Sequence, residues 1–244
     1  MLKIPQRKTP ISQIGNLVKF NEAEHSYLLN GKKFISVTTL VKKYKKPFDP
    51  DGKILFFCAR RAGISIEEMQ AQWDAKKESA CNRGVDFHLQ IENYIKGSGE
   101  IEKPTLEILE AECGQNQIEF LYPECRLCSP KYCVAGTSDL VHLFPDNSAA
   151  VYDWKTNKKF SNPINAKYRD KMLFPINNLG DSDLEIYSLQ LWCYALMLEE
   201  FGYPPKKSPM IFWLNPENKI EKFECLNVKK EAETIMRDHY LSKQ

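Results

Sequence analysis

The sequence has no long apolar run, no linker-like segment and no large excess of charge of one sign. No apolar stretch approaches the roughly 20 residues that span a bilayer, so we expect no membrane-spanning segment and no membrane partner. No Gly-, Ser- or Pro-rich segment divides the 244 residues, so we expect a single domain. Residues 1–8 have no apolar run behind their charges, which predicts no signal peptide and an intracellular protein.

The formal net charge is only +2, but the charges are unevenly distributed. Residues 1–61 carry 13 Lys and Arg against 4 Asp and Glu, whereas residues 62–130 carry 6 against 13. A polyanion-binding face needs such a basic region, and its densest parts contain Lys45 and Arg60. The alternative is a solvated run of charges that binds nothing.

The eight cysteines do not predict a disulfide framework, because the chain is large and shows no export signal. Cys125, Cys128 and Cys133 have a spacing typical of metal sites but no evident fourth ligand. We therefore expect reduced and mostly buried thiols, with a zinc or iron–sulfur site as the alternative.

Residues 133–156 predict a β-hairpin that carries two acids and a lysine. Both arms are rich in Val, Leu, Tyr, Phe and Trp, and they flank a turn-forming Pro-Asp-Asn-Ser cluster at 145–148. Asp153 and Lys155 are two residues apart, so on a strand their side chains leave the same face. The alternative is a surface hairpin whose Asp and Lys pair across solvent.

The register of this hairpin decides where the other acid, Asp139, lies. A loop with an odd number of residues puts Asp139 opposite Asp153, with Cβ atoms about 4.5–5.5 Å apart, whereas an even loop puts it opposite Trp154. Two adjacent carboxylates repel each other unless a cation neutralises them, and Mg²⁺ prefers carboxylate, water and phosphate oxygens. A lysine beside that ion can position a water or stabilise charge on a phosphate under attack.

The residues before the hairpin predict one small hairpin followed by helices. Asn30-Gly31 between two apolar runs is a type I′ turn signal, and Ser36 is placed to cap the next helix. A long helical region is expected over 54–95, interrupted near Gly63 and Gly84. Four aromatic residues are expected in the core, with base stacking on a single strand as the alternative; they are Phe56, Phe57, Trp73 and Tyr168.

The remaining patterns predict further strands and helices in a fixed order. They are a helix over 105–120, a strand over 119–127, the central hairpin, an irregular segment over 157–182, a helix over 184–201, a strand pair within 209–226 and a C-terminal helix over 227–244. Glu124 lies in the strand before the hairpin, and Lys158 lies in the irregular segment, whose length is typical of functional loops. Gln190 and Tyr194 share one face of an apolar helix, so they need polar partners if buried.

Five short motifs occur along the chain in the order of one known family. They are Gly84-x3-His88, Glu124, Gly136-x2-Asp139, Asp153-x-Lys155 and Gln190-x3-Tyr194. Over about residues 83–200 the chain resembles the RecB-like exonuclease branch of the PD-(D/E)XK nuclease superfamily. Residues 25–27 and 36–38 are also similar to phage-encoded members and to mitochondrial genome maintenance exonucleases, which implies host cytoplasm if the chain is phage-encoded.

The resemblance implies an α/β fold of the restriction-endonuclease-like class. In that class a mixed central sheet is flanked by helices, and here an N-terminal β-hairpin and helical additions would be joined to it. The implied division is a basic hairpin and helical region at 1–82, a catalytic core at 83–226 and a C-terminal helix at 227–244.

The resemblance also implies a role for each motif. The metal ligands it implies are His88, Asp139, Asp153 and the backbone carbonyl of Trp154. They would hold one or two Mg²⁺ or Mn²⁺ ions, and Lys155 would assist the attacking water. Glu124 either supports the metal shell or only ends a strand.

The implied partner is DNA, as single strands or ends. Gln190 and Tyr194 would contact it or brace the site, and the basic residues that would bind its backbone are Arg83, Lys158, Lys45 and Arg60. Iron–sulfur members place cysteines after the Gln-x3-Tyr helix, where this chain has only Cys225, so no such cluster is expected. The implied activity is a metal-dependent DNA exonuclease of recombination, repair or replication. The alternatives are a structure-specific endonuclease, a nuclease that acts on RNA, and a nucleic-acid-binding module without turnover.

Overall fold

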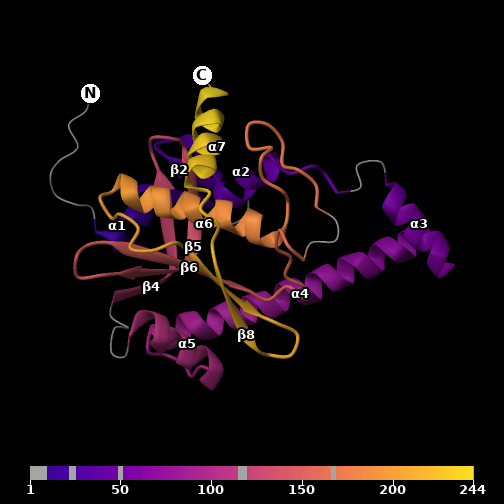
Figure 1. Cartoon of the computed structure of the whole chain (residues 1–244), viewed down its shortest axis with the longest axis horizontal. Coiled ribbons are helices and arrows are strands. Elements are labelled where there is room, and N and C mark those ends of the chain that lie inside the picture. The colour runs from indigo at the N-terminus through magenta and orange to yellow at the C-terminus, as the bar shows by residue number, and fades with distance from the viewer. Residues whose placement is uncertain (1–9, 22–25, 49–51, 115–119, 166–168, 244) are drawn as a thin grey trace.

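A mixed eight-stranded sheet lies between two layers of helices (Figure 1). The computed structural model describes residues 10–21, 26–48, 52–114, 120–165 and 169–243. Its strands are β1 (Lys19–Asn21), β2 (Ser26–Leu29), β3 (Lys32–Ser36), β4 (Leu121–Ser129), β5 (Val134–Leu143), β6 (Ala149–Lys155), β7 (Met210–Leu214) and β8 (Ile220–Glu224). Its α-helices are α1 (Ile11–Ile14), α2 (Val37–Lys43), α3 (Lys53–Ala62), α4 (Ile66–Ile95), α5 (Lys103–Cys113), α6 (Asp183–Glu200) and α7 (Lys229–Leu241), and a short 3₁₀ helix covers Gly15–Leu17. The expected fold class, α/β with a mixed central sheet flanked by helices, is confirmed.

The two helical layers cover two separate hydrophobic clusters. The larger cluster joins α2, α6 and α7 to one face of the sheet, and the smaller one joins α4 and α5 to the other face. Successive residues of β6 alternate between them, since Val151 belongs to the larger cluster and Tyr152 and Trp154 belong to the smaller one. Asp153 therefore leaves β6 on the face that α6 covers. None of the helices in the described part of the chain combines the length and apolarity that a bilayer crossing requires.

The sheet splits at the centre of β5. Strands follow the order β1-β2-β3-β5-β6-β7-β8, and β4 pairs with the other edge of β5. On the first edge, β3 pairs in parallel with β5 at Val134 and Ala135, whereas β6 pairs with it from Leu140 onward. In between, residues 136–139 have no ladder partner on that edge within the described ranges. The split leaves room for polar side chains in the middle of the sheet.

The central hairpin has the register that an odd loop predicts. Leu140 lies opposite Tyr152, and the Phe144 N–H donates to the Ser148 carbonyl at 2.9 Å, so the loop contains three residues. The predicted register is therefore confirmed. Continued one residue beyond the last pair, it aligns Asp139 with Asp153.

The local signals at one other turn and at the start of α2 are also confirmed. Asn30 and Gly31 have φ values of 49° and 79°, as a type I′ turn requires. The Ser36 hydroxyl accepts a hydrogen bond from the Thr39 N–H at 3.1 Å and caps α2. A capping box of Ser65 and Glu68 begins α4.

Two predicted helix boundaries are wrong. The helical region expected over 54–95 is interrupted at Gly63 as predicted. The second interruption, at Gly84, is absent, because α4 continues through that residue and an interior glycine costs a helix only about 1 kcal/mol. The helix expected over 105–120 is α5, which begins at Lys103 and ends before Gly114, whose φ is 84°. Residues 115–119 lie outside the described ranges.

The prediction that four aromatic residues lie in the core is wrong for two of them. Phe56 and Phe57 are 47% and 61% exposed, because they lie on the outer face of α3. Trp73 is half-buried, and Tyr168 lies outside the described residues. The amphipathic pattern of α3 predicts a helix, but it does not tell which face packs.

Candidate metal centre

Two carboxylates meet at the split in the sheet. Asp153 on β6 is only 1% exposed, and Asp139 on β5 is half-buried beside it. The Trp154 N–H donates to Asp139 Oδ2 at 2.9 Å, which fixes the direction of that carboxylate. Burial raises the pKa of Asp153, and the neighbouring charge of Asp139 raises it further. The pair is therefore costly without a cation.

Lys155 lies directly against this pair. Its Nζ forms an ion pair with Asp153 Oδ2, and it lies 4.8 Å from the ring centroid of Tyr187 on α6. Burial opposes the charge on Lys155, but Asp153 and Asp139 outweigh that effect and raise its pKa. Apart from this ion pair with Lys155, the described residues supply no hydrogen bond to the buried carboxylate oxygens of Asp153. Lys155 is thus a fixed cation next to a carboxylate with unused acceptor capacity.

His88 reaches the same place from α4. Its Nε2 lies 3.1 Å from the Trp154 carbonyl oxygen, and its Nδ1 lies 3.5 Å from Asp139 Oδ2 and 3.8 Å from Glu124 Oε1. If Nε2 carries the hydrogen, the lone pair of Nδ1 faces the two carboxylates, which is the usual orientation of a metal-binding histidine. Burial would lower the pKa of His88, but Glu124, Asp139 and Asp153 outweigh it and raise that pKa to about 9.

Glu124 has an unusual backbone conformation. Its φ is 45°, in the left-handed region that costs a non-glycine residue about 1–2 kcal/mol. The pairs on either side, Pro123 with Leu140 and Cys125 with Ser138, place it across β4 and β5 from Asp139. Sequence reasoning left the role of Glu124 open, because neither its φ nor its distance to His88 has a local signal.

One group of ligand atoms fits a divalent cation. The ligand atoms of His88, Glu124 and Asp139 all lie within 4.8 Å of one another. One nitrogen and two carboxylate oxygens suit Mn²⁺ or Mg²⁺, and Lys155 alone cannot neutralise the acids that gather here. Four side chains are predicted to bind the metal or assist the attacking water, and the structure brings them together with Glu124. They are His88, Asp139, Asp153 and Lys155. Direct ligation by Asp153 and by the Trp154 carbonyl stays a prediction, since these groups contact Lys155 and His88 respectively.

Tyr194 packs beside the candidate site from α6. It is only 2% exposed, and a Cβ added at Gly136 would lie 2.8 Å from its Cε1, so glycine is required there. Burial raises the pKa of Tyr194 well above its ordinary value, and the nearby Asp153 and Asp139 act in the same direction. A hydrogen bond joins it to Gln190, which is half-buried. Of the two predicted roles for Tyr194, its burial favours bracing over contact with nucleic acid.

The four predicted basic residues lie in different surroundings. Arg83 donates to the Asn215 carbonyl at 3.1 Å, and Lys45 forms an ion pair with Asp181 at 3.7 Å. Arg60 and Lys158 are exposed. Their binding to nucleic acid stays a prediction.

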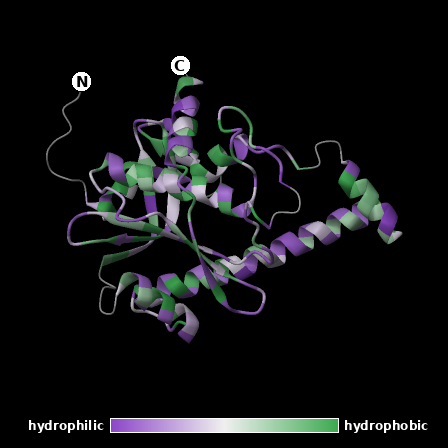
Figure 2. Ribbon diagram, viewed as in Figure 1, coloured by the Kyte–Doolittle hydropathy of each residue, from purple (hydrophilic) through white to green (hydrophobic). Residues whose placement is uncertain are grey.

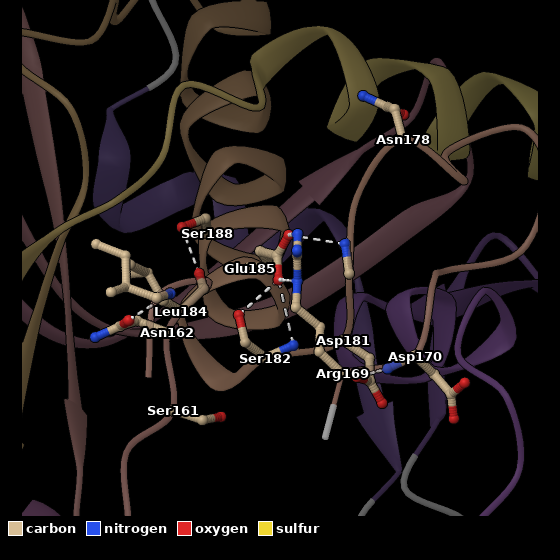
Figure 3. Close-up of polar contacts among 12 residues, drawn as sticks. Ser161, Asn162, Arg169, Asp170, Asn178, Asp181, Ser182, Leu184, Glu185 and Ser188 are labelled. Atoms are coloured by element: carbon tan, nitrogen blue, oxygen red, sulfur yellow. Dashed lines mark hydrogen bonds and ion pairs between the residues drawn. The ribbon is translucent and has the colours of Figure 1, made fainter. Parts of the chain in front are cut away.

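The irregular segment 157–182 is fastened to the start of α6 (Figure 3). Arg169 Nε donates to Glu185 Oε2 at 2.8 Å, the Gly180 N–H donates to Oε1 at 2.7 Å, and the Ser182 hydroxyl donates to Oε2 at 2.6 Å. Burial would raise the pKa of Glu185, but these donors outweigh it and lower that pKa to about 2. A Cβ at Gly180 would lie 2.0 Å from Arg169 Nε. We call these contacts of Glu185 with Arg169, Gly180 and Ser182 the clasp. Phe160 of the same segment lies 6.1 Å from the ring of Tyr187.

The cysteines with metal-like spacing are buried. Burial raises the pKa of the Cys125 and Cys128 thiols to about 12, which disfavours the thiolate that binds metal. In the described part of the chain, the cluster of possible metal ligands contains His88, Glu124 and Asp139 and no cysteine.

No protein-family model matches the chain, and no curated protein sequence matches it. Among solved structures, SSO0001 shares 15% identity and a TM-score of 0.39, over 86% of this chain and 76% of that one. A candidate exonuclease from Eubacterium rectale shares 12% identity and a TM-score of 0.39, over 84% of this chain and 77% of its own. Likeness at this level carries no argument about activity, so a functional conclusion must depend on the site.

Proposed function

We propose that this protein is a divalent-metal-dependent nuclease that hydrolyses phosphodiester bonds of DNA, as an exonuclease on single strands or ends. The observation that carries this proposal is the convergence of His88, Glu124 and Asp139 beside the buried pair of Asp153 and Lys155. These residues would bind a metal ion, stabilise negative charge and position the phosphate group of a substrate.

Each residue would have a separate task. His88, Glu124 and Asp139 would hold Mg²⁺ or Mn²⁺, which when bound supplies polarisation of the scissile phosphate and a more acidic water. Lys155 would orient the attacking water and offset negative charge that develops on the phosphate. Asp153 would keep Lys155 charged and in place, since the two groups are in contact.

The arrangement of charges supports catalysis over binding alone. A module that only binds DNA needs exposed cations, whereas Asp153 is 1% exposed and lies next to a second acid. Burying a carboxylate with a lysine costs several kcal/mol of desolvation and adds nothing to the attraction of a polyanion. In a nuclease, the same buried pair would help to hold a cation and a water next to a phosphate, so the desolvation cost would serve catalysis.

The test uses end-labelled linear and circular single-stranded DNA, with Mg²⁺, with Mn²⁺ and with chelator. The wild type should degrade the linear strand only with metal, and Asp153→Asn and Lys155→Gln should each lower the rate by at least about 100-fold. Matched controls come from an exposed ion pair between Asp146, in the turn of the same hairpin, and Lys206, in the segment between α6 and β7. Asp146→Asn and Lys206→Gln should cleave like the wild type.

Each other outcome decides against part of the proposal. Cleavage of circles would replace the exonuclease with an endonuclease on the same site. Full activity of both site variants would exclude the site itself. A wild type that binds DNA but cleaves nothing with any divalent metal would make the protein a binding module.

A further inference from the structure

The helices α3 and α4 form a hairpin that projects from the rest of the molecule. Figure 1 shows the N-terminal half of α4 leading away from the sheet, with α3 at its far end. A helix of 30 residues is about 45 Å long, and α4 contributes Phe87, Ile91 and Ile95 at its C-terminal end to the core. Over residues 66–86, Met69 is the only described side chain that is buried. The hairpin is thus anchored at one end and exposed over most of its length.

The outer face of α3 combines aromatic rings with positive charge. At 100° per residue, Phe56, Phe57, Arg60 and Arg61 fall within an arc of about 140°, and all four are exposed. Ala59 lies on the opposite side and is buried. The rings of Phe56 and Phe57 have centroids 5.7 Å apart and planes at 71°, so they present differently oriented surfaces. Figure 2 shows hydrophobic and hydrophilic residues side by side on this short helix.

A second aromatic pair joins this hairpin to the segment before α3. Phe48, which is 72% exposed, lies 6.2 Å from the ring of Trp73 on α4. Together with Phe56 and Phe57 it supplies four rings outside the core. Soluble proteins rarely expose several apolar rings together unless the surface binds a partner, so the cluster indicates a binding surface.

The charge of this surface identifies the partner. Residues 53–62 contain Lys53, Arg60 and Arg61 and no acid, and no ion pair of Arg60 or Arg61 occurs within the described residues. A second copy of the chain would bring like charges together across a two-fold axis. A single nucleic-acid strand offers flat bases to the rings and phosphates to the arginines, which is the pattern of single-strand binding surfaces.

We infer that the outer face of α3 is a binding surface for a single DNA strand, separate from the metal centre. The inference rests on the proposed function and deepens it, because it names the surface that would bind the strand and narrows the substrate from single strands or ends to single strands. Bases of the strand stack on Phe56 and Phe57, and Arg60 and Arg61 contact the adjoining phosphates. A duplex, whose bases are already stacked on one another, gains only the phosphate contacts.

The test measures binding without divalent metal, so that cleavage does not enter. Fluorescence anisotropy follows a labelled oligothymidylate of roughly 20 nucleotides, longer than the strand that one such surface covers. Replacing both rings, in Phe56→Leu/Phe57→Leu, should weaken binding about fivefold or more while keeping the apolar surface. Arg60→Gln/Arg61→Gln should lower the slope of log affinity against log salt by about 1.4.

Matched controls lie on α7. Leu241→Ala removes an exposed apolar side chain, and Lys230→Gln/Arg237→Gln removes two exposed cations. Both should bind the oligonucleotide like the wild type. Circular dichroism of every variant should show unchanged helix content, which separates loss of the surface from loss of the fold.

The outcomes separate this inference from the proposed function. If the wild type cleaves DNA but the α3 variants bind with unchanged affinity and salt slope, the inference is wrong and the nuclease stands. If the wild type binds single strands through α3 but never cleaves, the surface stands and the nuclease fails. Equal loss of duplex and single-strand binding, or a dimer that the ring substitutions dissociate, would overturn the assignment to a single strand.

Discussion

The Nε2 atom of His88 lies 3.1 Å from the carbonyl oxygen of Trp154. The N–H of the same tryptophan donates to Asp139 Oδ2 at 2.9 Å. One residue of β6 therefore orients two candidate ligands that come from α4 and β5. The side chain of Trp154 is buried in the smaller hydrophobic cluster, where its ring packs 5.8 Å from Phe87, one residue before His88. Core packing is thus coupled directly to the geometry of the candidate metal centre.

This relationship predicts that His88 contributes to metal affinity. We expect His88→Ala to weaken Mn²⁺ binding by at least about tenfold, because it removes the nitrogen ligand and the link to Trp154. Isothermal titration with Mn²⁺ measures the effect on the full chain. Glu92→Gln is the matched control, because Glu92 lies one turn further along α4 and pairs with Lys96. Equal affinity for the wild type and His88→Ala would exclude the histidine from the site.

The contact between Gly136 and Tyr194 predicts a packing requirement under the site. A Cβ at position 136 would lie 2.8 Å from the Tyr194 ring, so Gly136→Ala should lower the free energy of unfolding by about 1–3 kcal/mol. Gly84→Ala is the comparison, because its Cβ would meet only the Thr156 hydroxyl, at 3.3 Å, and alanine favours the helix. Urea unfolding of both variants measures the difference. Equal stability would show that Tyr194 moves aside without cost.

Much of the central site could be predicted from local patterns. The loop of three residues fixed the register of β5 and β6, and with it the position of Asp139 opposite Asp153, because strand periodicity is strict. The spacing of Gln190 and Tyr194 on one turn of α6 predicted their common face. In both cases the residues are close in sequence, so backbone geometry determines which side chains lie near one another.

Other parts could not be predicted because they depend on long-range packing. The left-handed backbone of Glu124 follows from its place between β5 and α4, and glutamate has no preference for it. Arg169 and Glu185 have a spacing that matches no period of helix or strand. Which face of α3 packs against the rest of the protein depends on tertiary contacts, and the hydrophobic pattern alone does not specify it. The continuation of α4 through Gly84 likewise depends on the packing of the helix.

The clasp at Glu185 predicts a stability that depends on pH. Its pKa in the folded chain is about 2, below the ordinary value of 4.5, so its contribution is complete above about pH 4.5. As the pH falls from 4.5 through 2 the carboxylate is protonated, and about 3 kcal/mol of unfolding free energy is lost. Glu185→Gln should show a correspondingly weaker loss over this range in chemical unfolding. The control Glu217→Gln affects an exposed pair with Lys219 and should follow the wild type.

Glu124 allows backbone strain and metal binding to be separated. Glu124→Ala and Glu124→Gly both remove the carboxylate, so both should weaken Mn²⁺ binding to the same extent. They differ in the backbone: at a φ of 45° alanine keeps the left-handed strain, whereas glycine relieves it at a smaller cost in chain entropy. Without metal, Glu124→Gly should therefore exceed Glu124→Ala in unfolding free energy by roughly 0.5–1 kcal/mol. If the alanine variant is the more stable of the two, the backbone at this position is not strained, and the carboxylate is placed there without energetic cost.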